Sequence, residues 1–306
     1  MSPRASRVAL VLVETMADDP LNLLRNVIDS PTDAIRWACL LEATAPKPGN
    51  VYPGCSFEDL EYHDFVVAAE IASKAFSQTR QPISKRMLSA VDSAVAQSRT
   101  NVNLGIVLLL GPLVSADETM ASDSTRARDP VNWAESVAEV LDRFDGVDGQ
   151  NIFKAINHAS AGGLGDVDSM DVRDTHPQVD IVKAMTLAAD RDLIARQYAT
   201  GFKDLIQRVV PLVDESIRLR GDLLAGMVDA HLRLLATEPD SLIARKNGLP
   251  VALRVQQNAR KVDLDHPVSI AKFDESLRTR GHELNPGATA DLLAAALYVL
   301  LRTPKH

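Results

Sequence analysis

The chain has 306 residues, 46% hydrophobic and only 4% aromatic, which is enough to bury one large core. A formal net charge of −8 argues against a broad basic surface for nucleic acid. The two cysteines, Cys39 and Cys55, give no sign of an oxidising compartment. The longest apolar run, 104–114, is shorter than the ~20 residues that span a bilayer. We therefore expect a soluble, cytoplasmic protein without nucleic-acid or membrane partners, and a homo-oligomer is left open.

Helical periodicity recurs along the chain and strand-type alternation does not. Ser30 and Pro31 are typical of a helix start, and the run 46–49 ends that first helix. Further helices are predicted over 62–76, 84–97, 102–114, 130–144, 150–159, 180–198, 202–217, 222–236, 249–259, 268–278 and 288–302. We expect one all-α domain of about eleven or twelve helices over 29–306, preceded by an N-terminal extension, 1–28.

The segment 102–114 is apolar on every side, which is typical of a buried central helix. We expect it to be the most buried helix of the fold. Pro112 is expected to kink or end it, and 115–129 is expected to form a surface loop.

Lys47 and Gly49 belong to a Pro-Lys-Pro-Gly turn after the first helix. The proline after Lys47 keeps it out of helical geometry, and Gly49 suits a position with positive φ. A lysine held this way can bind phosphate, or it can be a solvated residue at a helix stop. Glu42, one turn upstream, is a candidate metal ligand or base, or else a surface acid.

Two polar segments precede or follow apolar helices in the middle of the chain. Asn101 and Asn103 either cap the apolar helix or face a ligand with its free amides. Gly162 and Gly163 free the backbone to approach an anion. The acids that follow, including Asp171, form either a Mg²⁺ site or a mobile acidic loop.

Two more segments lie near the C-terminus. Arg245 and Lys246 are adjacent cations that follow Asp240, and they are either ligand-binding groups or a basic helix end. Gly287 leaves an unobstructed amide at the start of the last helix. Capping does not explain Asp291, which lies one turn further among apolar residues.

In their order these segments resemble the triphosphoribosyl-dephospho-CoA synthase family over about 34–301. The matching segments are an acid followed by the Pro-Lys-Pro-Gly turn (42–51), an Asn segment (101–105), a glycine segment (161–165), a short acidic segment (171–174), an Asp…Arg segment (240–248) and Pro-Gly-x-x-Ala-Asp-Leu (286–292). Asn103 and Ala244 stand where the family has histidine, and Leu242 where it has Asn. Phe57 lies near the place of another expected histidine. These departures indicate a divergent, archaeal-type branch.

The resemblance implies transfer of the triphosphoribosyl group of ATP to dephospho-CoA or a related cofactor precursor, with release of adenine. It assigns phosphate contacts to Lys47, Arg245 and Lys246, and Mg²⁺ to Glu42 and Asp171. Asp240 or Asp291 is the base or a ribose ligand, and Asn101 and Asn103 orient the nucleotide. The alternatives are a non-catalytic nucleotide-binding or regulatory protein, or a ribosyl transfer in pterin one-carbon cofactor biosynthesis.

These site residues lie far apart in the sequence, at helix boundaries. We expect Lys47, Asn101, Gly163, Asp240, Arg245 and Asp291 to line one cleft, because helix ends carry free amides and polar side chains.

Overall fold

The computed structural model describes residues 19–98, 102–123, 125–160 and 180–304. Within them the chain forms fifteen α-helices, a π-helical turn and a four-residue extended segment, with no β-sheet. In chain order these are α2 (Asn22–Arg25), α3 (Pro31–Thr44), α4 (Tyr62–Phe76), α5 (Ile83–Ser98), α6 (Leu104–Ser122), α7 (Pro130–Asp142), α8 (Gly146–Ser160), α9 (Ile181–Ala188), α10 (Leu193–Ala199), η1 (Leu205–Val209), α11 (Val210–Arg220), α12 (Leu223–Thr237), α13 (Ser241–Asn247), α14 (Leu249–Ala259), α15 (Pro267–Arg278), β1 (Thr279–His282) and α16 (Gly287–Arg302).

The predicted all-α class is confirmed, and several helix starts follow from local sequence. Ser30 caps α3 by accepting a hydrogen bond from the amide of Asp33, and Asp129 caps α7 in the same way. The helices outnumber the prediction because the expected helix 180–198 is divided at Asp192, which caps α10. Helices α2 and α13 were not predicted because they are too short to show a helical hydrophobic period.

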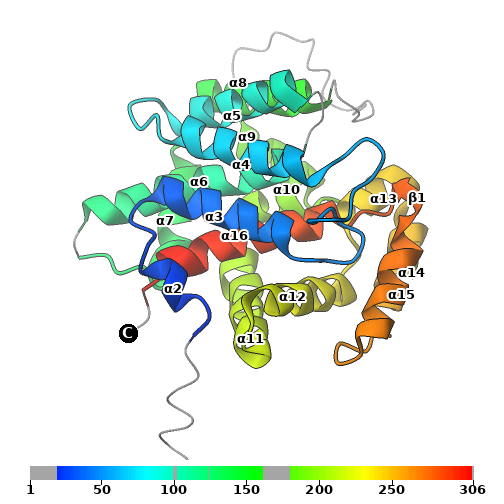
Figure 1. The fold of residues 1–306 in the computed structure, drawn as a ribbon. Coiled ribbons are helices and arrows are strands. Elements are labelled where there is room, and N and C mark those ends of the chain that lie inside the picture. Colours follow the sequence, from blue (N-terminus) through cyan, green and yellow to red (C-terminus); the bar gives the residue numbers. More distant parts are fainter. Residues whose placement is uncertain (1–18, 99–101, 124, 161–179, 305–306) are drawn as a thin grey trace, which may run out of the picture.

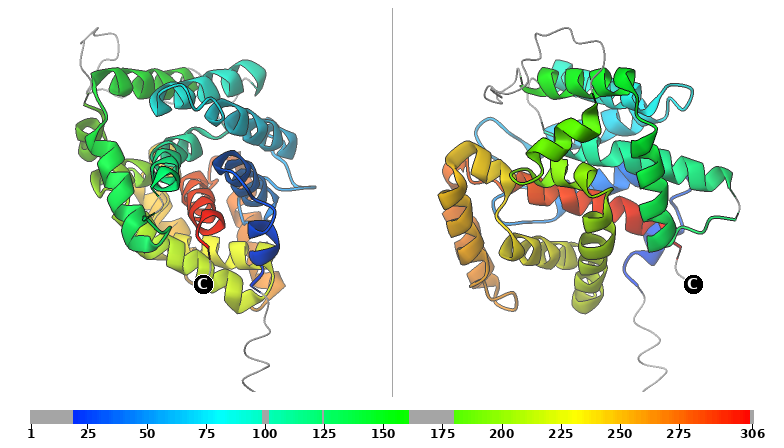
Figure 2. Two further views of the ribbon diagram at one scale, coloured as in Figure 1. Left: turned by 90° about the vertical axis from the view of Figure 1, so that its left-hand side faces the viewer. Right: turned by 180° about the vertical axis from the view of Figure 1, so that it is seen from behind.

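Helix α16 crosses the middle of the molecule. Helices α4, α5 and α8 stack on one side of it, and α11 and α12 lie on the other (Figure 1). The end-on view shows α16 between α3 and α6 (Figure 2, left). Nearly every residue from Ala288 to Leu301 is buried. The prediction of a buried central helix is confirmed, but α6 is not the most buried helix as predicted: α16 shares its central position, and a larger part of α16 is buried.

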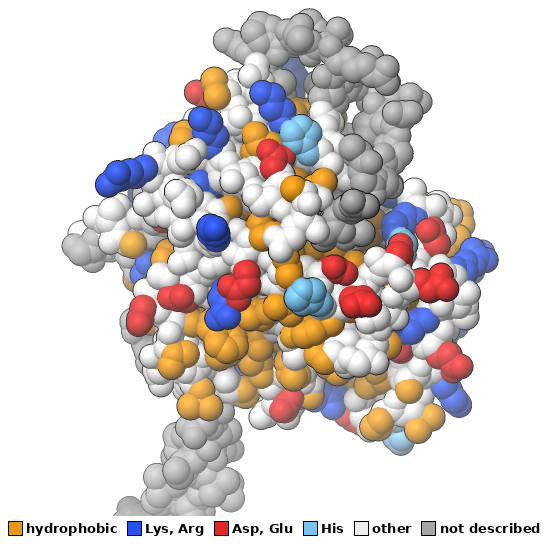
Figure 3. Space-filling model, turned by 45° about the horizontal axis from the view of Figure 1, so that its top comes forward, with side chains coloured by type: hydrophobic (Ala, Val, Ile, Leu, Met, Phe, Trp, Pro, Cys, Tyr) orange, Lys and Arg blue, Asp and Glu red, His pale blue; other side chains and the backbone are white. Residues whose placement is uncertain are grey.

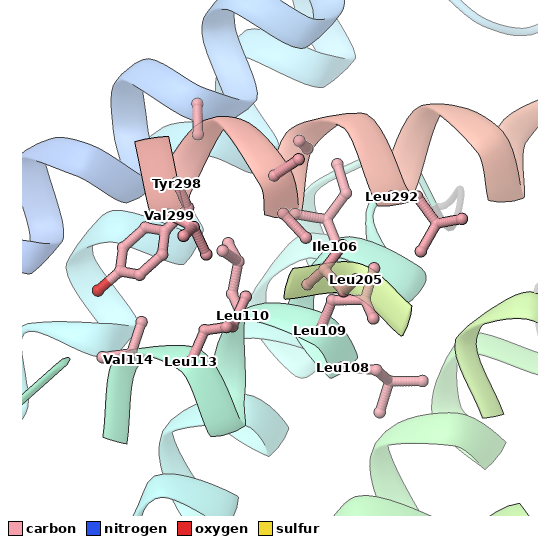
Figure 4. Packing of buried hydrophobic residues seen from close by; sticks show 14 of the residues in the cluster. Ile106, Leu108, Leu109, Leu110, Leu113, Val114, Leu205, Leu292, Tyr298 and Val299 are labelled. Atoms are coloured by element: carbon pink, nitrogen blue, oxygen red, sulfur yellow. The ribbon is translucent and has the colours of Figure 1, made fainter. Parts of the chain in front are cut away.

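Helix α6 packs its apolar residues against α16 and its neighbours. Leu109, Leu110 and Leu113 lie beneath Tyr298 and Val299 of α16 (Figure 4). By length and composition α6 is the single described helix that could cross a membrane, yet 67% of its most apolar window is buried inside the protein. This degree of burial is what a core helix shows.

Pro112 does not end α6, so the predicted surface loop 115–129 is wrong for residues 115–122, which are helical. A proline lacks the N–H that would bond to the carbonyl four residues earlier, which is that of Leu108. The hydroxyl of Tyr198 donates to this freed carbonyl at 2.7 Å. A long-range partner therefore satisfies the acceptor, and the helix continues.

We expect Tyr198→Phe to lower the free energy of unfolding by about 1–3 kcal/mol, because it leaves the buried Leu108 carbonyl without a partner. Urea unfolding measures this. Tyr62→Phe is the control, because it removes the same hydroxyl from a half-buried side chain whose described partner is the Thr44 hydroxyl. Equal losses in the two variants would contradict a special role for Tyr198.

Residues 19–28, which belong to the predicted N-terminal extension, pack on the end of α16. Leu21 is fully buried in the main core. Arg25 donates from Nε to the carbonyl of Leu300 at 2.9 Å. This part of the extension therefore covers the C-terminal end of the central helix.

Candidate functional site

The start of α13 is joined to the start of α16 by one carboxylate. Asp240 caps α13, and its Oδ1 accepts from the amides of Leu242 and Ile243 at 2.8 and 3.0 Å. Its Oδ2 accepts from the amide and hydroxyl of Thr289 at 2.7 and 2.8 Å. Complete burial raises the pKa of Asp240, while these hydrogen bonds oppose the shift. Asp240 therefore holds two helix N-termini together.

Asp291 lies one turn into α16 and touches the first turn of α6. A Cβ placed on Gly105 would lie 2.0 Å from Oδ2 of Asp291, so only glycine leaves room for this carboxylate. Asp291 makes no hydrogen bond or ion pair with any described residue. Its carboxylate, unlike that of Asp240, is free to act on a ligand.

The surroundings of Asp291 oppose its negative charge. Burial is the largest cause that raises its pKa well above the ordinary value, followed by the charges of Glu42, Asp240 and Asp192. Arg245 offsets part of this effect. A carboxyl group with a raised pKa can accept a proton from a substrate near neutral pH.

Glu42 and Lys47 form a buried ion pair beside this carboxylate. Lys47 is fully buried, and its Nζ lies 2.9 Å from Oε1 of Glu42. The same Nζ also donates to the backbone carbonyl of Glu42 and, at 3.5 Å, to that of Ala45. In this arrangement Lys47 neutralises Glu42, and both side chains are engaged within the protein. Their assignments to phosphate and to metal stay predictions.

The Pro-Lys-Pro-Gly turn docks on α15. Gly49 has φ +77°, and its amide donates to Oδ1 of Asp274 at 2.7 Å. A Cβ at Gly49 would lie 2.8 Å from Leu277 and 2.9 Å from Pro286. Gly49 is thus required by the backbone and by packing, and its predicted ligand contact stays a prediction.

Two more predicted residues are engaged in packing. A Cβ on Gly287 would lie 2.6 Å from Leu242, so this glycine lets α16 approach α13 closely. Asn103 is buried, and its Nδ2 donates to the carbonyl of Ala68 at 3.3 Å. The predicted residues Asn101, Gly162, Gly163 and Asp171 lie outside the described residues.

Arg245 on α13 is the cation that acts on Asp291, and Lys246 follows it on the same helix. Nη1 of Arg245 is 3.7 Å from Oδ2 of Asp192, and its side chain is half exposed. Nζ of Lys246 donates to the carbonyl of His282 at 3.5 Å. Burial, and then the charge of Arg245, lowers the pKa of Lys246. An anionic ligand would relieve this repulsion.

Asp192 belongs to the same group, and sequence reasoning missed it. Its Oδ1 caps α10 through the amides of Ile194 and Ala195, while its Oδ2 faces Arg245. The amide of Leu193 donates to the Ser241 hydroxyl at 3.1 Å, which docks α10 on α13. An aspartate directly before an apolar pair was the available signal of a helix start.

Asp240, Arg245 and Glu42 lie close enough to Asp291 to act on its charge, and Glu42 is paired with Lys47. That these residues line one cleft stays a prediction. Acidic and basic side chains are interspersed on the face shown in Figure 3, which presents no broad basic surface in its described part. An anionic ligand that binds this face would therefore have to be met by a local cluster of cations.

The described residues contain no group of three or more His, Cys, Asp or Glu side chains arranged to hold a metal ion. Glu42 is paired with Lys47, and Asp240 is bound by Thr289. Of these three candidate acids, Asp291 is therefore the one without a partner among the described residues. Mg²⁺ commonly binds one or two carboxylates together with substrate phosphates. The donor set in this part of the chain does not fit a resident metal held by protein side chains alone.

His231 on α12 is buried behind the Lys47 side chain. It is fully buried, and neither ring nitrogen has a hydrogen-bond partner among the described residues. Burial and then the charge of Lys47 lower its pKa to about 3, and the nearby Pro48 carbonyl offsets a small part of this. His231 is therefore neutral in the folded protein at pH 5–7.

We expect His231 to make the fold less stable in mild acid. Because its folded pKa lies below the ~6.5 of an unfolded chain, only the unfolded state gains a proton as the pH falls. His231 alone should therefore lower the free energy of unfolding by about 2 kcal/mol between pH 7 and pH 5. Urea unfolding of His231→Gln should show a shallower pH dependence. His63→Gln, which replaces an exposed histidine, is the control. If the free energy of unfolding of His231→Gln depended on pH as strongly as that of the wild type, the assignment would be contradicted.

Comparisons with known proteins show which proteins the chain resembles. The family described as "CitG: ATP:dephospho-CoA triphosphoribosyl transferase" matches residues 28–305. The 2-(5''-triphosphoribosyl)-3'-dephosphocoenzyme-A synthase of Pectobacterium atrosepticum is 32% identical over 99 residues, which cover 31% of this chain and 32% of that protein. A Pectobacterium carotovorum relative matches to the same extent. Each of these matches thus spans about a third of the relative's length. A solved candidate triphosphoribosyl-dephospho-CoA synthase from Archaeoglobus fulgidus shares the fold, with a TM-score of 0.61 and 24% identity over 77% of this chain and 97% of that one.

Proposed function

The chain belongs to the ATP:dephospho-CoA triphosphoribosyl transferase family, and on that premise we propose that it transfers the triphosphoribosyl group of ATP to a hydroxyl of dephospho-CoA or a related cofactor precursor. Adenine is the leaving group. The observation that carries the proposal is the unpartnered Asp291 carboxylate, pressed against Gly105 where α6 and α16 begin.

Asp291 is the proposed general base. It removes the proton from the acceptor hydroxyl as the oxygen bonds to C1′ of the ATP ribose. The bond from C1′ to the purine nitrogen breaks, its electron pair leaves with adenine, and the departing base gains one proton, which balances the proton that Asp291 takes up. The raised pKa of Asp291 suits this role, because a base is most effective when its pKa lies near the working pH.

Asp240 is better suited to positioning than to proton transfer. Its two oxygens already accept four hydrogen bonds from α13 and α16, so it has little capacity left for a substrate proton. We propose that Asp240 holds α16, the helix that carries Asp291, against α13. Of the two acids that the sequence indicated, the geometry therefore favours Asp291 as the base.

Arg245 and Lys246 are the proposed partners of the triphosphate. Arg245 is half exposed, and its single described ion pair, with Asp192, is 3.7 Å long, so it can turn to a ligand. Mg²⁺ bound to the triphosphate would supply further charge neutralisation. Asp192, which pairs with Arg245, also lies close enough to Asp291 to act on its charge.

The test measures adenine release by chromatography with ATP, Mg²⁺ and dephospho-CoA, beside ATP affinity by calorimetry. Arg245→Ala should weaken ATP binding by about tenfold, because a hydrogen bond to a charged group is lost. Arg254→Ala, an exposed arginine of α14, is the matched control and should leave the affinity unchanged. Tight ATP binding without adenine release from any related acceptor would instead support a non-catalytic nucleotide-binding protein.

A further inference from the structure

A groove of about 230 Å³ lies between α14 and α15, which run side by side at one end of the molecule (Figures 1 and 2). One face of each helix forms a wall, with residues at helical spacing. The lining residues are Val251, Arg254, Val255 and Asn258 of α14, Phe273, Ser276 and Leu277 of α15, and Thr279, Arg280 and Leu284 after it. None of them has been given a role in the proposed chemistry.

The floor of the groove is apolar. Val255, Phe273 and Leu277 belong to a hydrophobic cluster that is shared by α12, α13, α14 and α15. Val251 and Leu284 pack against this cluster but are only partly buried. The groove therefore offers the open edge of a hydrophobic core to an apolar side chain from outside.

The rim of the groove carries positive charge. The lining contains two exposed arginines, Arg254 and Arg280, and no acid. Neither guanidinium makes an ion pair or a side-chain hydrogen bond with any described residue. By contrast, Arg278 of α15 is paired with Asp274 at 2.9 Å. In a chain with a net charge of −8, two arginines of this kind beside an apolar floor are complementary to an acidic ligand.

Arg280 also borders a hollow of about 440 Å³ whose lining includes the acids Glu58, Asp59 and Glu283. None of these acids forms an ion pair with Arg280, and Asp59 binds His282 instead, at 3.1 Å. The guanidinium of Arg280 is therefore available to a ligand in the groove.

The size of the groove favours a peptide segment over a whole small molecule. Small-molecule sites have volumes of ~300–1,000 Å³, and this groove is smaller. An amphipathic segment needs less room, because it places only its apolar side chains in a groove and leaves its charged side chains at the rim. Asn258, Ser276 and Thr279 provide polar groups at the border of such a contact.

We propose that the groove between α14 and α15 is a docking site for an acidic amphipathic segment of a partner protein. The apolar side chains of that segment fill the floor, and its carboxylates pair with Arg254 and Arg280. The proposal concerns an interaction surface and does not rest on the proposed function.

Selection of phage-displayed random peptides on the full chain tests the docking site. We expect the enriched peptides to carry several acids beside apolar residues at helical spacing. Fluorescence anisotropy of a labelled selected peptide then measures its affinity. Combining Arg254→Glu with Arg280→Glu should weaken binding by at least about tenfold, because like charges then face each other. Lys272→Glu is the matched control, since it makes the same change of charge at an exposed position of α15 outside the lining, and it should leave the affinity unchanged.

Val251→Ser tests the apolar floor in the same assay and should also weaken binding. Its control is Leu253→Ser, which replaces a side chain of α14 that is 38% exposed and lies outside the lining. Urea unfolding of each variant separates a loss of fold from a loss of contact. The proposal is overturned if no peptide is enriched, if basic peptides are enriched, or if the selected peptides bind all these folded variants equally.

Two other occupants are distinguished by further measurements. A wild-type dimer that dissociates when Arg254→Glu and Arg280→Glu are combined, seen by analytical ultracentrifugation, would assign the groove to a second copy of the chain instead. Displacement of the selected peptide by dephospho-CoA would assign it to a small-molecule substrate, which also overturns the proposal. Adenine release should be the same in the wild type and in this double variant, so failure of the docking site leaves the proposed function intact.

Discussion

Asp291→Asn should abolish most of the adenine release and, at the same time, make the protein more stable. The amide keeps the shape that fits against Gly105 but cannot accept the substrate proton. General-base catalysis contributes typically ~10²–10⁴-fold, so we expect release to fall by at least about a hundredfold. Chromatography of adenine at saturating ATP measures this loss.

The gain in stability follows from the direction of the pKa shift. Burial and the charges of Glu42, Asp240 and Asp192 raise the folded-state pKa of Asp291. The ionised carboxylate is therefore less favourable in the folded than in the unfolded chain at every pH above the unfolded pKa. Replacing it should stabilise the fold at pH 8 by on the order of 1 kcal/mol, and the gain should vanish as the pH falls below ~4.

Asp240→Asn is the matched control for this result. It should lower the free energy of unfolding, because Asp240 accepts four hydrogen bonds between α13 and α16. In urea unfolding, we expect the free energy of unfolding to rise for Asp291→Asn and to fall for Asp240→Asn. A loss of stability in Asp291→Asn, or retained adenine release, would contradict the assignment of Asp291 as a strained functional base.

Asp117→Ala should produce the largest loss of stability in the protein, about 3–5 kcal/mol. Asp117 is fully buried on α6 and accepts from Nε of Arg128 at 2.5 Å, Nε of Arg302 at 2.7 Å and the hydroxyl of Tyr298 at 2.9 Å. Removing it leaves two guanidinium groups without their shared anion at the contact of α6 with α16. Guanidinium unfolding measures the loss.

The surface carboxylate Asp265 provides the comparison. It also binds an arginine, Arg220 at 2.6 Å, but it is 79% exposed. Exposed ion pairs contribute at most ~1 kcal/mol, so Asp265→Ala should have little effect. Asp117→Asn should fall between the two, because the amide oxygen can still accept from Tyr298. Similar small losses in Asp117→Ala and Asp265→Ala would show that the buried cluster does not join the two central helices.

Local sequence determined the helical class and many helix ends. Ser30 and Asp129 could be identified as helix starts because a cap depends on its own side chain and on amides two or three residues away. The set of polar segments near Asp291 was also recognisable, since glycine, asparagine and charged residues interrupt apolar periodicity.

The tertiary structure alone decided which of these groups are free. Asp240 and Asp291 look alike in the sequence, but Thr289 reaches back to saturate the first, and Gly105 makes room for the second. The sequence predicts that Pro112 kinks or ends its helix. In the structure the hydroxyl of Tyr198, distant in sequence, donates to the Leu108 carbonyl that the proline leaves without its usual partner. Capping and periodicity act within one or two turns of chain, whereas hydrogen bonding and burial of a polar group depend on residues that only folding brings to it.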